Sequence, residues 1–272
     1  MRCIKTGSLL LLVISLLQSC KHDPLPGPST VRIWEDVSIR AIYEVPAPAG
    51  RNEEGDATIE LLSDSSLKYT FHIHNLSPSD TLTAAHIHAG DAGTSAGVLI
   101  NLQPVFIGAG ATGQITGLRP GQIDTLLTKP VYINVHSKQV PSGLTRGQLD
   151  KKIDFAMDIA MNGANEAPTP VSTTAFGTAI LRLTDDKVLY SKVTVNNLET
   201  DDTLTVAHVH RGALGAAGPV RITLCSGLAD FGVLKISAPL QDSLVTILKN
   251  DPCYVNAHSK NHGPGVVRGQ IR

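Results

Sequence analysis

The amino-acid sequence repeats itself, and this repeat constrains the fold more than any other feature. The segment Ala85–Gly90 returns as Ala207–Gly212, a shift of 122 positions, from His86 to His208. The same shift relates further segments, so neither copy has a net insertion between them. These segments are Glu44–Pro46 with Glu166–Pro168, Asp80–Thr83 with Asp202–Thr205, Tyr132–Ser137 with Tyr254–Ser259, and Arg146–Gln148 with Arg268–Gln270. The chain is therefore predicted to contain two tandem copies of one domain.

The start of the chain carries the marks of a secretory signal. Arg2 and Lys5 precede the apolar run Leu9–Leu17, which is too short to span a bilayer as a helix. The run leads into Gln18-Ser19-Cys20, and this exit resembles the lipobox of bacterial lipoproteins. We predict a signal peptide over residues 1–19 and a lipid on Cys20, the alternative being an ordinary signal peptide. A lipid anchor implies a bacterial cell envelope protein, held at the outer membrane, the cell surface or the periplasmic face.

Proline content and copy length suggest the domain boundaries. Three prolines lie between Asp23 and Ser29, which predicts an extended tether over residues 20–31. We place the first domain at residues 32–150 and the second at residues 151–272, each of a usual domain size. A net charge of −1 argues against binding to nucleic acid, which requires a basic surface. The expected partners are a membrane, through the lipid, and an unknown protein or matrix component.

Both copies show short strand patterns and no long helical period. Thr58–Leu61 and Lys68–His74 alternate between apolar and polar residues, as half-buried strands do. We predict an all-β fold of two tandem Greek-key β-sandwich or barrel domains. Ile123–Leu127 is expected to form a turn or two of helix before Pro130. The other expected strands are 81–88, 98–102, 131–137 and 144–149 in the first copy, and 179–183, 190–195, 203–210, 220–224, 253–259 and 266–271 in the second.

Three histidines recur in each copy and suggest a metal site. His86 and His88 lie two residues apart on a predicted strand, so their side chains point to the same side. His136, on a separate strand, can supply a third nitrogen. Three neutral imidazoles suit copper or zinc and leave an open coordination position. The equivalent residues in the second copy are His208, His210 and His258.

A structural hydrogen-bond network is the second interpretation of the same histidines. His86 and His88 share strand parity with Leu82 and Ala84, which predicts that they continue an inward-facing stripe. Buried polar groups of this kind must find partners. An arginine beside three imidazoles would oppose a bound cation, which favours the network. The further members expected are Asn134, Arg146 and Gln148 in the first copy, and Asn256, Arg268 and Gln270 in the second.

No catalytic residue is predicted. The sequence contains no Gly-x-Ser-x-Gly elbow, phosphate-binding loop or His-Glu-x-x-His motif. His72 and His74 are expected on a solvent-facing strand surface, and His262 in an exposed loop. Glu44 and Glu166 are interpreted as residues of strand ends or turns. We therefore expect a protein that is not an enzyme.

Cys225 and Cys253 offer a disulfide in the second copy. An exported compartment permits disulfides, and a bridge closing this loop would contribute about 3–4 kcal/mol. The equivalent positions in the first copy are Gln103 and Val131, so the bridge would belong to the second copy alone. The alternative is a pair of buried free thiols.

With these motifs, each copy resembles the CHRD domain, a module first described in chordin and found in bacterial secreted proteins. The resemblance rests on Asn165–Pro168, the Ala-His-Ile-His-Ala-Gly block at Ala85–Gly90, the Tyr132–Ser137 strand and the closing Arg146–Gln148. The first copy departs at its start, where Ala41–Pro46 keeps only the Glu and the Pro of the family pattern. The resemblance implies an extracellular β-rich domain and no established catalytic activity. It is compatible with a binding module whose partner is unknown.

The histidine pattern is also similar to that of copper/zinc superoxide dismutases. Those enzymes carry a His-x-His strand, a glycine-rich loop and a late strand with another histidine, as His86, His88 and His136 do here. No histidine lies between Ala89 and Tyr132, so the bridging ligand and the zinc-loop ligands have no counterpart. The similarity implies a related barrel topology rather than dismutase activity. It keeps a copper or zinc site with redox capacity as the alternative function.

Overall fold

The computed structural model of the protein describes residues 27–272. The predicted signal peptide, Cys20 and most of the predicted tether lie outside the described residues. Strand β1 (Thr30–Arg40) begins one residue before the expected end of the tether. Within residues 27–272, no helix combines the length and the apolar character needed to cross a bilayer.

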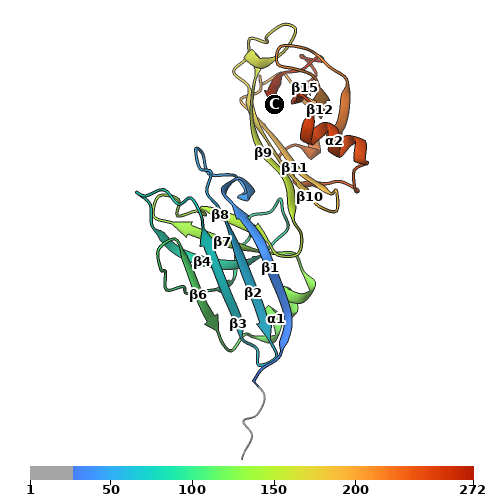
Figure 1. Cartoon of the computed structure of the whole chain (residues 1–272). Coiled ribbons are helices and arrows are strands. Elements are labelled where there is room, and N and C mark those ends of the chain that lie inside the picture. Colours follow the sequence, from blue (N-terminus) through green and yellow to red (C-terminus); the bar gives the residue numbers. More distant parts are fainter. Residues whose placement is uncertain (1–26) are drawn as a thin grey trace, which may run out of the picture.

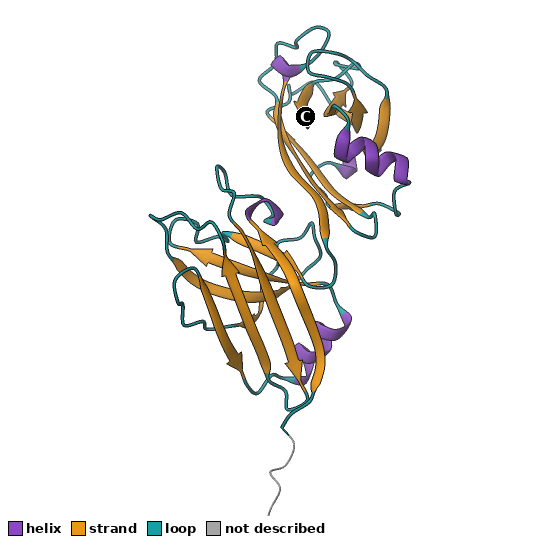
Figure 2. Ribbon diagram, in the orientation of Figure 1, coloured by secondary structure: helices purple, strands orange, loops and turns teal. Residues whose placement is uncertain are grey.

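Unit 1, the first copy, is a single curled sheet of eight antiparallel strands (Figures 1 and 2). After β1 and the short 3₁₀ helix η1 (Ala41–Tyr43), its other elements are β2 (Glu54–Leu62), β3 (Leu67–Ile73), β4 (Leu82–Ala89), β5 (Val98–Asn101), β6 (Gly110–Ile115), α1 (Pro120–Thr128), β7 (Val131–Ser137) and β8 (Thr145–Gln148). The spatial order is β5-β4-β7-β8-β1-β2-β3-β6.

Unit 2, the second copy, repeats this arrangement. Its elements are β9 (Ile153–Asn162), η2 (Gly163–Asn165), β10 (Phe176–Thr184), β11 (Leu189–Asn196), β12 (Leu204–Arg211), β13 (Val220–Cys225), η3 (Leu228–Asp230), β14 (Lys235–Ile236), α2 (Asp242–Asn250), β15 (Cys253–Ser259) and β16 (Val267–Gln270). The order β13-β12-β15-β16-β9-β10-β11-β14 matches that of unit 1 strand for strand. The prediction of two tandem β domains is confirmed.

Two strands of unit 1 were absent from the sequence prediction, for identifiable reasons. In β1 the pairing register shifts between Trp34 and Val37, and Asp36 adopts a φ of 51°. This bulge breaks the alternation that marks a strand. Strand β6 contains Gly110 and Gly113, which have no side chains, so the alternation of apolar and polar residues is not visible there. Helix α1 is also longer than expected.

The inside of each curled sheet forms the core. In unit 1 the fully buried side chains Ile39, Ile59, Phe71, Ile87 and Ile133 come from five different strands. Helices α1 and α2 cover their sheets through Leu126 and Leu248, both of which join the core clusters. One strand face therefore points inward, and the opposite face remains available for polar side chains.

The two units meet at a packed junction. Arg182 on β10 is fully buried, donates to the backbone carbonyl of Glu44 in unit 1, and forms an ion pair with Asp158 at 2.7 Å. The Tyr43 hydroxyl donates to the Ile153 carbonyl at 3.0 Å. These contacts fix unit 2 against the end of unit 1 that follows β1.

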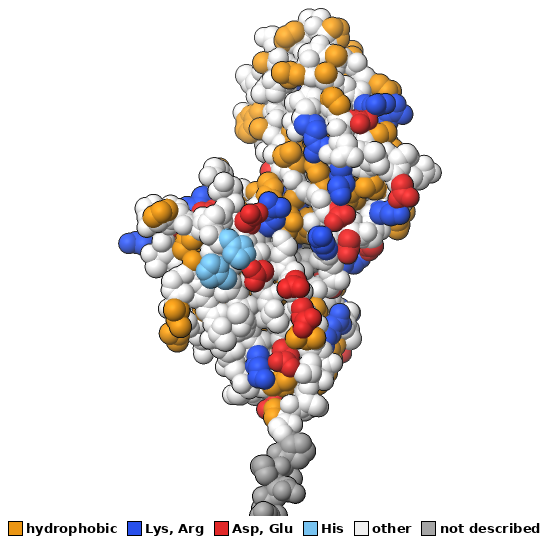
Figure 3. All heavy atoms as spheres, viewed as in Figure 1, with side chains coloured by type: hydrophobic (Ala, Val, Ile, Leu, Met, Phe, Trp, Pro, Cys, Tyr) orange, Lys and Arg blue, Asp and Glu red, His pale blue; other side chains and the backbone are white. Residues whose placement is uncertain are grey.

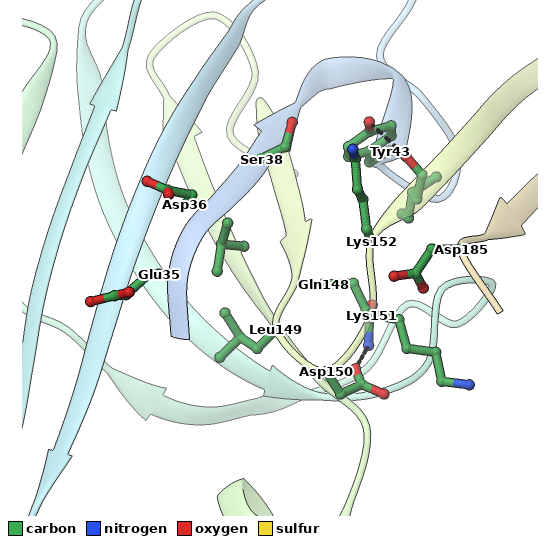
Figure 4. A pocket seen from close by; sticks show the side chains of 12 residues that line it. Glu35, Asp36, Ser38, Tyr43, Gln148, Leu149, Asp150, Lys151, Lys152 and Asp185 are labelled. Carbon is green, nitrogen blue, oxygen red and sulfur yellow. Dashed lines mark hydrogen bonds between the residues drawn. The ribbon is translucent and has the colours of Figure 1, made fainter. Parts of the chain in front are cut away.

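A pocket lies beside the junction (Figure 4). Its lining includes Glu35 and Asp36 from β1, and Lys152 and Asp185 from unit 2. None of the six recurring histidines lines this pocket. Acidic and basic side chains are also intermixed on the face of the molecule seen in Figure 3.

Candidate metal centre in each unit

A β-bulge at the start of β4 decides which way its histidines point. The register against β7 shifts between Leu82 and Ala84. Leu82 lies in the core, and beyond the bulge Ala85 and Ile87 are the fully buried residues. His86 therefore lies on the outer face of the sheet. The prediction that the histidines continue the inward stripe is wrong, because one extra residue exchanges the two faces.

Unit 2 contains the same bulge, between Leu204 and Ala207. Ala207 and Val209 point into the core there, so the histidines of β12 also lie on the outer face. The predicted network residues share this face. In unit 1 the cross-strand register aligns His86 with Asn134 and Arg146, and His88 with Tyr132 and Gln148.

The three histidines of each unit converge. One ring nitrogen from each of His86, His88 and His136 lies within 4.8 Å of the others, and the same holds in unit 2. His86 Nδ1 lies 2.9 Å from His136 Nε2. The equivalent atoms of His208 and His258 are 3.4 Å apart. We call each set a triad: His86, His88 and His136 form the first, and His208, His210 and His258 form the second.

Backbone carbonyls fix the protonation of two rings in the first triad. His88 Nδ1 lies 2.8 Å from the Ala96 carbonyl, and His136 Nδ1 lies 2.9 Å from the Pro141 carbonyl. A carbonyl can only accept, so both Nδ1 atoms carry the hydrogen and both Nε2 atoms present a lone pair. Metal-bound histidines are typically oriented by such outer hydrogen bonds.

The second triad is oriented in the same way. His210 Nδ1 lies 2.9 Å from the Gly218 carbonyl, and His258 Nδ1 lies 2.8 Å from the Gly263 carbonyl. His88 and His210 are each more than nine-tenths buried, and their Nε2 atoms have no hydrogen-bond partner among residues 27–272. A buried lone pair without a donor is costly, and both units retain it at the same position.

Burial favours the neutral form of five of the six triad imidazoles. Burial, reinforced by the neighbouring His136 and His88, lowers the pKa of His86 to about 4. Burial also lowers the pKa of His88 and of His136. In unit 2 it lowers the pKa of His208 and of His210. Neutral imidazole is the form that coordinates a metal.

A tyrosine separates the buried arginine from the triad. The Tyr132 ring stacks on His88 with centroids 4.9 Å apart, and the Arg146 guanidinium lies 3.5 Å from the Tyr132 centroid. Unit 2 repeats the stack through His210, Tyr254 and Arg268. The guanidinium is thus held against an aromatic face rather than beside the ring nitrogens.

The same arginine holds the cover loop, which we define as residues 90–97 in unit 1 and residues 212–219 in unit 2. Arg146 donates to the carbonyls of Asp91 and Thr94, and Gln148 Nε2 donates to the Gly90 carbonyl at 2.8 Å. In unit 2 the acceptors of Arg268 are the Ala213 and Ala216 carbonyls, each at 3.0 Å, and Gln270 donates to the Gly212 carbonyl at 3.0 Å. The predicted polar network therefore surrounds each triad and closes a loop over it.

A buried carboxyl group extends this network. Asn134 donates to Glu44, and burial raises the pKa of Glu44 to about 7 against the opposing charge of Arg146. In unit 2, Asn256 donates to Glu166 at 2.9 Å, and the pKa of that carboxyl group is likewise raised to about 7 by burial. The sequence prediction gave both glutamates no role beyond strand ends. The recurrence of a glutamate two residues before a proline in both copies was the sequence signal that could have revealed this role.

The predicted disulfide is not present. Cys225 and Cys253 are buried free thiols. Cys225 pairs with Ala207 on one side of β12, and Cys253 pairs with Arg211 on the other side. Two strand spacings, about 9–10 Å, separate their backbones, which exceeds the reach of a disulfide.

His72 and His74 take no part in a triad. Both are exposed, their Nδ1 atoms lie 3.3 Å apart, and His74 pairs with Asp56 at 2.7 Å. His72 lies on the outer face of β3 and His74 directly follows this strand, so both lie in a different part of the sheet from the triad strands.

Comparison with known proteins agrees with this description. The family model for the CHRD domain matches residues 37–149 and 157–271, so each match contains one triad and one cover loop. No curated protein and no solved structure matches the chain. The chain belongs to the CHRD domain family and carries two tandem copies of the domain.

Proposed function

We propose that each CHRD unit binds one copper or zinc ion through its triad, and that the chain is a metal-binding protein rather than an enzyme. The observation that carries this proposal is the buried Nε2 of His88, and of His210 in unit 2, which presents a lone pair with no donor. A metal ion supplies the missing partner. The network interpretation explains the Nδ1 hydrogen bonds but leaves this nitrogen unsatisfied.

The spacing of the nitrogens supports the same proposal. Tetrahedral coordination at ordinary metal–nitrogen distances places two ligand nitrogens about 3.3–3.4 Å apart. His208 Nδ1 and His258 Nε2 are 3.4 Å apart, which matches this spacing, whereas the equivalent atoms in unit 1 are 2.9 Å apart and would have to separate slightly to hold an ion. His86 and His136 are only partly buried, which leaves a route for an ion. Three imidazole ligands leave a fourth position for water or another small ligand.

We further propose that the chain is a lipoprotein of the bacterial envelope. The support is the sequence pattern that ends at Cys20. Figure 1 shows the chain entering unit 1 at the end opposite to unit 2. Such an anchor would hold unit 1 near the membrane and present unit 2 outward to a protein or matrix component. Labelling with a radioactive fatty acid, lost in Cys20→Ala, tests this part.

Elemental analysis tests the metal sites. The full-length protein is dialysed against copper or zinc salts and then against buffer, and bound metal is counted per chain. Two triad variants, H86A/H88A and H208A/H210A, are each expected to lose one ion relative to the wild type. The control is H72A/H74A, which removes two exposed imidazoles from unit 1 and should keep the wild-type count. A wild-type protein that retains no metal, or triad variants that retain all of it, would refute the proposal.

A further inference from the structure

Unit 2 contains a second cluster of metal-ligating side chains, distinct from its triad. One ligand atom from each of Glu199, Asp202 and His262 lies within 4.8 Å of the others. Glu199 and Asp202 come from the turn between β11 and β12, and His262 comes from the loop between β15 and β16. The sequence prediction placed His262 in an exposed loop and gave it no role.

The Asp202 carboxylate is buried but only half satisfied. Asp202 as a whole residue is only 8% exposed. Its Oδ1 accepts from the backbone of Thr203 at 2.7 Å and of Asn261 at 2.9 Å. The Ser259 hydroxyl lies nearby and lowers the pKa of Asp202, yet within the described part of the chain Oδ2 has no partner in hydrogen-bond geometry. Burial of an unpaired carboxylate oxygen requires a compensating charge or donor.

Glu199 adds a second free oxygen. Its Oε1 accepts from the Thr173 hydroxyl at 2.5 Å, while Oε2 is shielded from solvent and finds no hydrogen-bond donor among the residues that the structure describes. The hydrogen bond from Thr173 lowers the pKa of Glu199. Two ionised carboxylates therefore meet at one point beside an imidazole.

Unit 1 shows what unit 2 lacks. There the equivalent carboxylate, Asp80, receives Arg51 Nη2 at 2.6 Å and the Ser137 hydroxyl at 2.7 Å on the same Oδ2. Arg51 also pairs with Glu53 at 2.6 Å. The shift of 122 positions replaces Arg51 by Thr173 and Glu53 by Ala175, and it replaces Ser77 by Glu199 and Val140 by His262. Unit 2 has thus lost the cation and gained two metal-ligating side chains.

We propose that a divalent cation, with zinc as the best fit, binds Glu199, Asp202 and His262 and takes the place that the Arg51 guanidinium holds in unit 1. Carboxylate oxygen and imidazole nitrogen together are common zinc ligands, whereas calcium prefers oxygen alone. Three protein ligands leave one position for water. The site uses none of the triad residues, so it does not depend on the function proposed for them.

The structure also suggests the competing explanation. A protonated His262 would supply the missing positive charge without any metal. The two explanations differ in their response to zinc, because only a metal site changes the number of ions bound.

Zinc counting on the full-length protein tests the proposal with variants copied from unit 1. The protein is dialysed against zinc chloride, and bound zinc is measured per chain. H262V and E199S restore the unit 1 residues, and T173R restores the guanidinium. Each variant is expected to hold one zinc fewer than the wild type. V140H is the matched control, since it adds the histidine to unit 1 while Arg51 remains, and it should gain none.

A second readout guards against misfolding. Zinc should raise the midpoint of thermal unfolding less in H262V than in the wild type, while both share a midpoint in chelator within a few degrees. An unchanged zinc count in H262V and E199S would overturn the proposal and favour a protonated His262. Measuring H262V in the H208A/H210A background keeps the two proposals separate, because a further loss of one zinc there belongs to this site alone.

Discussion

Units 1 and 2 share the stack of histidine, tyrosine and arginine on the outer face of their sheets, yet differ in what surrounds it. The stack of histidine, tyrosine and arginine recurs with His-to-Tyr centroid distances of 4.9 Å in both units. By contrast, the Arg51–Asp80 ion pair has no equivalent in unit 2. The comparison shows that the stacked arginine and the cover loop accompany the triad in both units, whereas the charged pairs of Arg51 at the rim of the sheet occur in unit 1 alone.

The cover loops also differ in their support. In unit 1, Ala92 joins a buried cluster with Tyr190 of unit 2, and a Cβ at Gly93 would lie 2.4 Å from Leu234 Cδ1. In unit 2, Leu214 at the middle of the loop is 75% exposed. The first loop is therefore held from both sides, and the second from one side only.

The largest expected effect tests the shared part of the comparison. Replacing Arg146 or Arg268 by Met leaves two loop carbonyls and a glutamine oxygen without their donor. We expect each variant to lose about 3–5 kcal/mol of unfolding free energy, because each unsatisfied buried acceptor costs about 1–3 kcal/mol. Denaturant unfolding measures this loss. A cost below about 1 kcal/mol in one unit would break the equivalence of the two stacks.

The buried glutamates give the next largest effect, through pH. The folded-state pKa of Glu44 is about 7, above its ordinary value of 4.5, so the folded protein binds more protons between these values. Its contribution to stability is therefore full below about pH 4.5 and is lost as pH rises through 7. E44Q stays neutral and should gain up to about 3 kcal/mol over the wild type between pH 4 and pH 8.

Unit 2 supplies the comparison for this titration. E166Q should show a gain of the same sign, because burial also raises the pKa of Glu166 to about 7. Denaturant titrations in chelator at both pH values measure the two gains. The lowered pKa values of the histidines make stability rise with pH, opposite to the effect of the glutamates. This contribution is the same in variant and wild type, so it cancels in the difference between them. A gain that shrinks at high pH would contradict the burial of either carboxyl group.

A smaller effect is expected on the rate of metal release, and it rests on the proposed metal sites. A chelator should remove the ion of unit 2 before that of unit 1, because only the unit 1 loop is held by the neighbouring unit. Leu234→Ala should speed release from unit 1 about tenfold, which corresponds to about 1.4 kcal/mol. Leu214→Ala is the matched control and should change neither phase. Equal rates in the wild type would remove this distinction between the loops.

The smallest effect concerns the cysteines, which distinguish unit 2 from unit 1. Cys253→Val copies Val131 of unit 1 and should change stability by less than about 1 kcal/mol, since it is a swap between small apolar side chains. Reducing agent should leave the unfolding midpoint of the wild type unchanged. A midpoint that falls on reduction would show that Cys225 and Cys253 form a disulfide in the wild type after all.

Much of this architecture could be predicted from the sequence. The shift of 122 positions gave the two units, the alternation of Lys68–His74 gave a strand, and the recurring histidine pairs indicated which side chains converge. The face of the sheet could not be predicted. The bulge before Ala84 is set by the pairing of β4 with β7, so the alternation of residues along β4 could not reveal it.

Two other features could not be predicted because they depend on how strands and loops are arranged in three dimensions. The cysteines are 28 residues apart in sequence but lie on opposite sides of β12, a fact set by strand order. The cluster of Glu199, Asp202 and His262 joins two separate loops. A residue-by-residue comparison of the copies held a signal for it, since Arg51 and His262 each lack their counterpart.

Arg182 has a mechanical consequence. The Arg182 guanidinium of unit 2 reaches the backbone of unit 1. The equivalent position in unit 1 is Glu60, so this contact can form only with the two units in their present order. Separating unit 2 from unit 1 would break this small set of contacts while leaving the hydrogen bonds between the strands of each sheet in place. The barrels would then part as whole bodies, and a desolvated positive charge would become the first newly wetted surface.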